Sequence, residues 1–128
     1  MIETILMCLA LNVYFEARSD SMEGQYAVAH VVMNRVQSNR FPSDVCSVVT
    51  QHRKGRTCQF SWYCDGKSDK PKDAYAMAYA TMVAADVLRG EAVDITDGAT
   101  HYHANYVRPY WASELEYTVT IGSHLFYK

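Results

Sequence analysis

The stretch Asn12-Val13-Tyr14-Phe15-Glu16-Ala17-Arg18 decides how the rest of this 128-residue chain is interpreted. A helix turns by about 100° per residue, so Glu16 falls within about 40° of Ile5 and Leu9 on one helix face. This places a carboxyl group at the end of a stripe that is expected to face the core. Low dielectric disfavours the charged form of such a group, so Glu16 is a candidate general acid with a raised pKa. The structural alternative is that Glu16 caps the helix end or pairs with Arg18.

Helical patterns lie on both sides of this stretch. Residues 2–17 predict a first helix, and residues 22–38 predict a second that is apolar on nearly every face. Such a helix is surrounded by protein, so the second helix is expected to be the central element. Asp20 followed by Glu23 is a capping-box pattern at its start. The side chains of the first helix expected to point inward are Ile2, Ile5, Leu6, Leu9 and Val13.

The middle of the chain predicts two further helices separated by an aromatic segment. Ser43 or Asp44 is expected to cap a short helix ending near residue 51, and residues 52–57 read as a loop. The aromatic segment spans residues 58–64, and a helix follows over residues 73–88, with Gly90 placed to end it. One face of this helix is expected to pack in the core: Tyr75, Tyr79, Met82 and Asp86.

The last third has the period-two alternation of β-strands. Residues 99–107 and 116–121 are rich in β-branched and aromatic side chains, and Gly122-Ser123 predicts a hairpin to residues 124–127. The sequence therefore predicts one α+β domain over residues 1–128, with a mainly helical body and a small antiparallel β element toward the C-terminus.

Composition excludes several classes of partner. The net charge of -2 provides no attraction for nucleic acid or an anionic membrane. The 12 uncharged residues between Glu3 and Glu16 are too few to span a bilayer, and they lack the basic and cleavage regions of a signal peptide. The ten tyrosines and two tryptophans fit a core, and they also suit a cleft that binds sugars or peptides.

The four cysteines leave three alternatives open. Cys8 lies in the first apolar helix and is expected to be a buried thiol. Cys58 and Cys64 are close enough to form a disulfide, Cys46 is a rival partner for either, and free thiols remain possible. Zinc bound by thiols with His101 and His103 is disfavoured because no Cys-x-x-Cys motif is present. The histidine in the second helix, His30, is expected to be a core residue rather than a ligand.

Three blocks of sequence follow one another in order and span nearly the whole chain. The first block is Asn12–Val36, with a Glu-Ala-Arg signature and an Asn-Arg-Val end. The second is Cys58-Gln-Phe-Ser-Trp-Tyr-Cys-Asp-Gly66. The third runs from Gly98-Ala-Thr-His-Tyr-His through Pro109-Tyr-Trp111 to Ile121-Gly-Ser-His-Leu-Phe-Tyr127. Together these blocks resemble the SleB-type cell wall hydrolases, a family named for a spore cortex-lytic enzyme.

The resemblance implies a lysozyme-like fold and cleavage of peptidoglycan glycan strands between N-acetylmuramic acid and N-acetylglucosamine. The family's catalytic glutamate falls on Glu16, and the spore members are lytic transglycosylases. The cysteine-flanked second block is more similar to proteobacterial and phage members. We therefore expect a monomeric lytic transglycosylase of the cell wall, without metal or cofactor. It would be a phage endolysin released through a pore made by another protein, or an excised domain.

Two rival functions remain at this stage. A hydrolytic muramidase would need a second carboxylate, and the candidates are Asp20, Glu23, Asp65 and Asp97. A glycan-binding module without catalysis would leave Glu16 with a structural role only.

The expected substrate-binding side chains lie in the two non-helical blocks, where loops on a helical scaffold carry polar groups. Those expected around Glu16 are Gln59, Phe60, Ser61, Tyr102 and His103, with Trp111 nearby.

Overall fold

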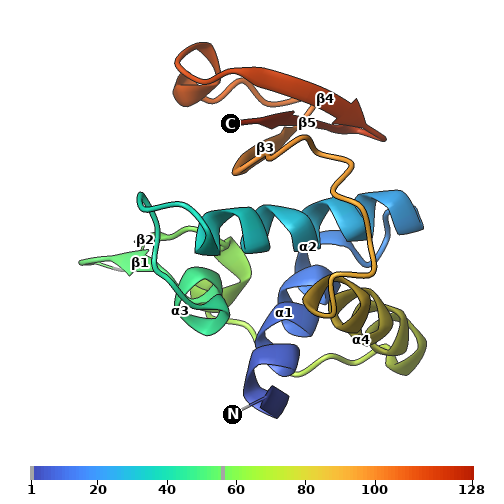
Figure 1. The fold of residues 1–128 in the computed structure, drawn as a ribbon. Helices are drawn as coiled ribbons and strands as arrows, with labels where there is room; N and C mark the ends of the chain where they lie inside the picture. Colours follow the sequence, from blue (N-terminus) through green and yellow to red (C-terminus); the bar gives the residue numbers. More distant parts are fainter. Residues whose placement is uncertain (1, 56) are drawn as a thin grey trace.

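The computed structural model describes residues 2–55 and 57–128, with side chains from residue 5 onward. Its helices are α1 (Ile2–Ala17), α2 (Met22–Val36), α3 (Val45–Val49) and α4 (Ala74–Leu88). A three-stranded sheet of β3 (His101–Ala104), β4 (Tyr117–Ile121) and β5 (His124–Tyr127) lies on one side of them (Figure 1). Short 3-10 turns cover Ser61–Cys64 (η1) and Tyr110–Ser113 (η2).

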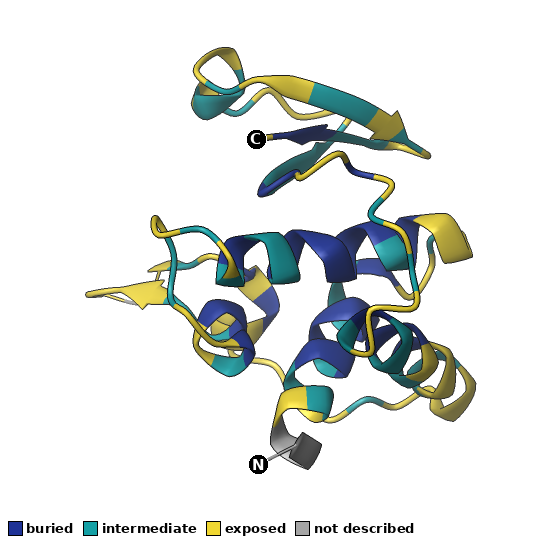
Figure 2. Cartoon of the chain, viewed as in Figure 1, coloured by how far each residue is buried: buried dark blue, intermediate teal, exposed yellow. Residues whose placement is uncertain are grey.

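Helix α2 is the central element, as expected. It lies between the sheet and the other helices, and most of its length is buried (Figures 1 and 2). Ala27 and Val31 pack against Phe126 of the sheet. Ala29 and Val32 belong to the core shared by the helices. Residues buried on opposite faces of one helix explain why its sequence is apolar on nearly every face.

The ends and faces of α1 and α2 differ from expectation in two places. Leu9 and Val13 are fully buried, but Ile5 is 37% exposed because it lies in the first turns, beyond the packed helices. The side chain of Ile2 lies outside the described residues. The cap of α2 is Ser21, which accepts from the N–H of Gly24, and the capping box at Asp20 is wrong because the helix begins one residue later.

Helix α4 ends at Leu88 as predicted but begins one residue later than predicted, because Asp73 is its N-cap. Gly90, with φ 73°, follows the C-cap residue Arg89. Its predicted core face is wrong. Tyr75, Tyr79 and Met82 are exposed, because the opposite face packs in the core through Ala80, Val83, Ala84 and Val87. Alanines allow close approach to α1, and this leaves the bulky side chains toward solvent.

The sheet has the order β3-β5-β4, and all pairs are antiparallel. The predicted hairpin at Gly122-Ser123 is confirmed, whereas β3 is shorter than the predicted strand over residues 99–107. The predicted loop over residues 52–57 contains a small hairpin of β1 (His52–Arg53) and β2 (Thr57–Cys58).

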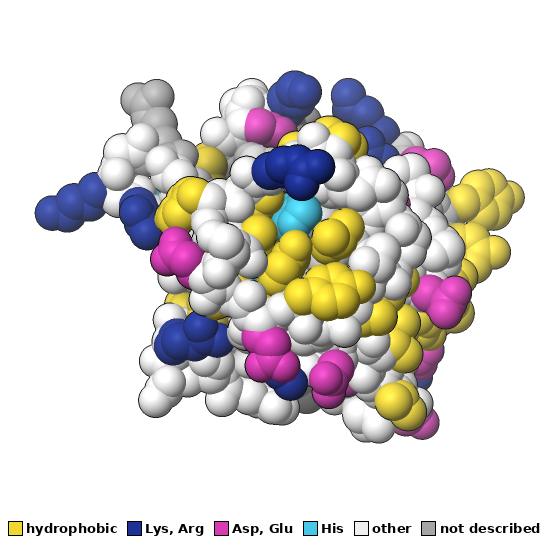
Figure 3. All heavy atoms as spheres, turned by 90° about the horizontal axis from the view of Figure 1, so that it is seen from above, with side chains coloured by type: hydrophobic (Ala, Val, Ile, Leu, Met, Phe, Trp, Pro, Cys, Tyr) yellow, Lys and Arg dark blue, Asp and Glu magenta, His cyan; other side chains and the backbone are white. Residues whose placement is uncertain are grey.

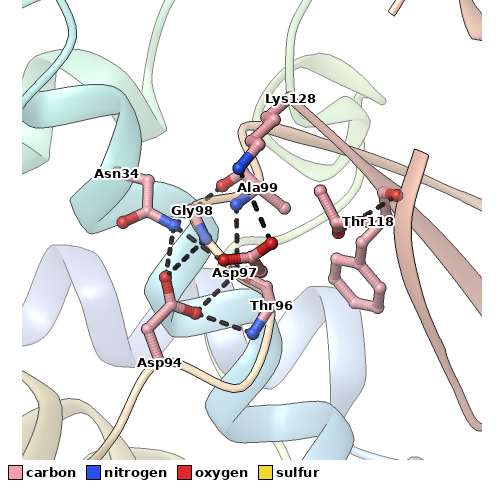
Figure 4. Close-up of polar contacts among 9 residues, drawn as sticks. Asn34, Asp94, Thr96, Asp97, Gly98, Ala99, Thr118 and Lys128 are labelled. Carbon is pink, nitrogen blue, oxygen red and sulfur yellow. Dashed lines mark hydrogen bonds and ion pairs between the residues drawn. The ribbon is translucent and has the colours of Figure 1, made fainter. Parts of the chain in front are cut away.

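A polar network fixes the chain where it enters β3 (Figure 4). Asn34 of α2 donates from Nδ2 to Asp94 Oδ2 and to the carbonyl of Ala99, both at 2.9 Å. Asp94 also accepts from the N–H groups of Thr96 and Gly98. The loop before β3 is therefore bonded to the central helix, which holds the position of the strand.

Two disulfides join the cysteines: Cys8 to Cys46 and Cys58 to Cys64. The expected free thiol at Cys8 is wrong, because α3 packs on α1 and brings the Cα atoms of the first pair to 5.3 Å. Because all four cysteines form disulfides, the free-thiol and zinc alternatives are excluded. Within the described part of the chain, no helix has the length and apolar character needed to cross a bilayer.

Candidate active site

Glu16 lies in the last turn of α1, partly buried beneath the sheet. The hydroxyl of Tyr102, from β3, donates a hydrogen bond to Glu16 Oε1. Burial raises the pKa of Glu16, and the negative charge of Asp20 acts in the same direction. The hydrogen bond from Tyr102 and the positive charge of Arg35 lower the pKa. The net effect is a raised pKa, which confirms the direction predicted from the helix pattern. The alternative of an ion pair is wrong, because the guanidinium of Arg18 lies over the Tyr14 ring at 4.9 Å.

Tyr102 is a stable hydrogen-bond donor. Burial and the charge of Glu16 hold the pKa of its hydroxyl well above the ordinary value, so the proton stays on the oxygen. Its ring packs against Phe126, 5.5 Å between centroids, and His124, 5.6 Å away. Strand β3 thus presents a fixed O–H group to the carboxyl group of α1.

Arg35 is a buried cation that the site prediction omitted. It comes from the last turn of α2, its Nε donates to the carbonyl of Thr100 at 2.7 Å, and its guanidinium lies between the rings of Phe41 and Phe60. Burial lowers the pKa of Arg35 to about 10, so it remains charged at neutral pH. Its Nη1 is buried with no hydrogen-bond partner among the described residues. The sequence signal was an arginine in the last turn of a helix expected to be surrounded by protein.

Two cavities meet at Glu16. The smaller has a volume of about 140 Å³ and is lined by Arg35, Gln59, Phe60, His101, Tyr102 and Trp111 beside Glu16. The larger, of about 490 Å³, includes Ser61 and Trp62 in its wall. Five of the six side chains expected around Glu16 therefore line a cavity with it: Gln59, Phe60, Ser61, Tyr102 and Trp111.

His103 lines neither of these cavities. Neighbouring side chains of a strand point to opposite faces, so His103 points away from the face on which Tyr102 meets Glu16. Its ring stacks on Tyr127 at 5.3 Å, and its Nε2 is 2.9 Å from the Tyr127 hydroxyl. Trp111 and Tyr117 also contact Tyr127, and Figure 3 shows hydrophobic side chains gathered around a histidine on this face.

His101, rather than His103, lines the smaller cavity. Burial and the positive charges of Arg35 and Arg40 lower the pKa of His101 to about 4, so its ring is neutral at neutral pH. The ring lies 5.1 Å from that of Trp111. It therefore offers an uncharged polar edge to whatever occupies the cavity.

The larger cavity has an aromatic wall fixed to α1. Trp62 donates from Nε1 to the side-chain oxygen of Asn12 at 2.8 Å, and its ring stacks on Phe15 at 4.9 Å. The disulfide between Cys58 and Cys64 closes the same segment. These contacts place the second sequence block against the end of α1.

Of the four candidate second carboxylates, Asp65 lines the larger cavity with Glu16. Asp97 lies 3.6 Å from Lys128, Asp20 lies 3.7 Å from His124, and Glu23 is exposed on α2. Among the residues that the structure describes, no group of three or more metal-binding side chains is arranged to hold an ion.

The sequence pattern of the family described as Cell Wall Hydrolase matches residues 19–127. The chain belongs to the cell wall hydrolase family. Glu16 lies three positions before the matched range. This cell wall hydrolase is 30% identical over 122 residues to the spore cortex-lytic enzyme of Halalkalibacterium halodurans. The aligned residues make up 94% of this chain and 34% of that enzyme. A second spore cortex-lytic enzyme, from Bacillus subtilis, is 49% identical over 41 residues.

Solved structures extend the similarity to the whole fold. The catalytic domain of the germination-specific lytic transglycosylase SleB from Bacillus anthracis superposes with a TM-score of 0.80 and 28% identity, covering 98% of this chain and 95% of that one. The catalytic domain of the Bacillus cereus SleB protein gives a TM-score of 0.79 at 28% identity, with 98% and 91% covered. The fold of this cell wall hydrolase is therefore α+β and lysozyme-like. The chain spans about a third of the length of the H. halodurans enzyme, 34%.

Proposed function

We propose that this cell wall hydrolase is a lytic transglycosylase that cleaves peptidoglycan glycan strands between N-acetylmuramic acid and N-acetylglucosamine. The observation that carries the proposal is a glutamate with a raised pKa, bonded to Tyr102 at the junction of two cavities. The similarity to a lytic transglycosylase over 98% of the chain supports it. We propose as well that residues 1–128 act as one catalytic domain and as a monomer.

In the first step, Glu16 donates its proton to the glycosidic oxygen, and the bond from that oxygen to C1 of the muramic acid breaks. A general acid must hold its proton near the working pH, and burial shifts the pKa of Glu16 in that direction. In the second step, the C6 hydroxyl oxygen of the same sugar bonds to C1 and its proton passes to the Glu16 carboxylate. The products are a free N-acetylglucosamine end and a 1,6-anhydro-muramic acid end.

Neighbouring groups fit both states of Glu16. The Tyr102 bond and the positive charge of Arg35 favour the carboxylate, which is the form needed for the second step. Burial acts in the opposite direction and favours the acid form needed for the first step. One carboxyl group can therefore serve as acid and then as base.

A hydrolytic muramidase is the second candidate, and the observation in its favour is Asp65 in the wall of the larger cavity. In this reaction a carboxylate would activate water or bond to C1, and the ends would be reducing sugars.

The test is digestion of purified peptidoglycan followed by mass spectrometry of the released fragments. We expect anhydro ends, which are lighter than hydrolysed ends by one water. Reducing ends would select the muramidase. Glu16→Gln keeps the size of the side chain but removes the transferable proton, and should lower turnover by roughly 10²–10⁴-fold. Glu23→Gln, on the exposed surface of α2, is the control. A folded Glu16→Gln protein that clears peptidoglycan at the wild-type rate would reject catalysis by Glu16.

A further inference from the structure

The larger cavity beside Glu16 combines an aromatic wall with a basic rim. Its volume is about 490 Å³, and its wall includes Tyr14, Phe15 and Trp62. Four cationic side chains line it as well: Arg18, Lys67, Lys70 and Lys72. This accumulation contrasts with the net charge of -2 for the whole chain.

The rim has an excess of positive charge. Asp65 and Glu16 are the carboxylates among the described residues that line the cavity, so its cationic side chains outnumber them. Among the described residues, the side chains of the three lysines form no ion pair or hydrogen bond, and the guanidinium of Arg18 lies over the Tyr14 ring at 4.9 Å. These cations are therefore available to a ligand.

The segment that carries the three lysines, residues 67–72, is held to α1 by hydrogen bonds. The hydroxyl of Tyr14 accepts from the backbone N–H groups of Lys72 and Asp73, both at 3.1 Å. Asp65 Oδ1 accepts from the N–H of Lys67 at 2.9 Å. The basic rim thus has a fixed place relative to Glu16 on the same helix as Tyr14.

We propose that this cavity binds the carboxylates of the peptide carried by the muramic acid, so that the enzyme prefers peptide-bearing glycan strands to bare ones. This inference rests on the proposed function. The peptide is attached through the lactyl group of the sugar whose C1–O bond would be cleaved, so it begins within one ring of the Glu16 carboxyl group. A cavity that starts at Glu16 and is rimmed by cations is where its carboxylates would lie. The aromatic wall suits the apolar side chains of such a peptide.

The experiment compares two substrates prepared from one batch of peptidoglycan free of teichoic acid. One keeps its stem peptides with free carboxylates, and in the other an amidase has removed them. Wild type, Lys67→Gln/Lys70→Gln and the matched control Arg53→Gln/Lys54→Gln are assayed on both. The control removes two charges from exposed residues that line a different cavity.

For wild type and control we expect a higher kcat/KM on peptide-bearing strands. In Lys67→Gln/Lys70→Gln the ratio between the two substrates should fall by about 3- to 10-fold, as for two exposed charge contacts. Added salt should reduce the wild-type ratio in the same direction. Equal kcat/KM on the two substrates in wild type would overturn the inference. So would an equal loss on both substrates in the lysine variant, because the lysines would then act on the glycan itself.

A binding measurement separates this inference from the proposed function. Co-sedimentation of Glu16→Gln protein, with and without the lysine changes, measures retention on both substrates without turnover. Stronger retention on peptide-bearing strands that depends on the lysines supports the basic cavity, even where wild type releases no fragments and the transglycosylase proposal fails. Equal retention rejects the basic cavity and leaves the transglycosylase proposal intact.

Discussion

At the scale of single residues, the chemistry of the site depends on opposing influences on one carboxyl group. Burial raises the pKa of Glu16, and the Tyr102 hydrogen bond lowers it. The spacing of Glu16 from Leu9 indicates the burial, because both follow from one helix. The bond to Tyr102 joins residues 86 positions apart and could not be predicted from helix spacing.

Tyr102→Phe tests this balance. Removing a hydrogen bond to the charged form raises the pKa of Glu16 further, so the general acid stays protonated to higher pH. The alkaline limb of the kcat/KM profile should therefore move to higher pH, while the rate falls because the carboxylate loses a positioning group. Tyr106→Phe, at a residue 85% exposed, is the control. An alkaline limb at its wild-type position would contradict the assignment of that limb to Glu16.

Asp65→Asn distinguishes the two proposed reactions. Transglycosylation takes its nucleophile from the substrate, so we expect less than about a threefold change in turnover. Loss of a required second carboxylate would instead lower turnover by roughly 10²–10⁴-fold. The amide oxygen of asparagine can still accept from the Lys67 N–H, and Asp69→Asn, in the same exposed segment, is the matched control.

At the scale of helices and strands, the sequence predicted the approximate limits of most elements. It did not always predict which face of an element is buried. Helix α4 was placed correctly, but its exposed tyrosines were assigned to the core because a bulky apolar face and an alanine face look alike in a periodic pattern. The same difficulty explains why His103 was expected beside Glu16 but lines neither cavity there. Period-two alternation predicts a strand, but only the packing of the sheet on α2 decides which of Tyr102 and His103 meets Glu16.

The two disulfides join elements in different ways, and their removal should have different effects. Cys8–Cys46 connects α1 to α3 across 38 positions, so Cys8→Ser/Cys46→Ser should lower the free energy of unfolding by about 3–4 kcal/mol. Cys58–Cys64 closes six positions, and its loss should cost only about 2 kcal/mol. Urea denaturation measures both.

The activities of the two double variants, measured at urea concentrations well below their unfolding transitions, should fall in the reverse order. The shorter bridge closes the segment that carries Gln59 and Phe60, so its loss should reduce kcat/KM more than loss of the longer one. Equal activity of the two double variants in folded protein would contradict a positioning role for the shorter bridge.

At the scale of the whole molecule, the site opposes stability. The folded state raises the pKa of Glu16 above its ordinary value of 4.5, so unfolding releases a proton once the pH exceeds that value. Below the ordinary pKa of 4.5, Glu16 is protonated in both states and does not lower the free energy of unfolding. The free energy of unfolding then falls as the pH rises from this value through the folded pKa. The three-block resemblance predicted the lysozyme-like fold, but not the buried Arg35 that lies close to Glu16.

Glu16→Gln should relieve this cost. We expect its melting temperature to exceed that of wild type at neutral pH, and the difference to disappear in acidic buffer below the ordinary pKa of 4.5. Glu23→Gln, exposed on α2, should show no such dependence. A gain for Glu16→Gln that is the same at both pH values would mean that ionisation of Glu16 is not its cause.

The pairing of all four cysteines also bears on when the protein becomes competent. Bacterial cytoplasm keeps thiols reduced, whereas the periplasm oxidises them. In a reducing compartment the chain would therefore lack both the bond that closes the segment of Gln59 and Phe60 and the link between α1 and α3. We expect the reduced chain to be less active than the oxidised one, so that oxidation of the four cysteines would switch the activity on.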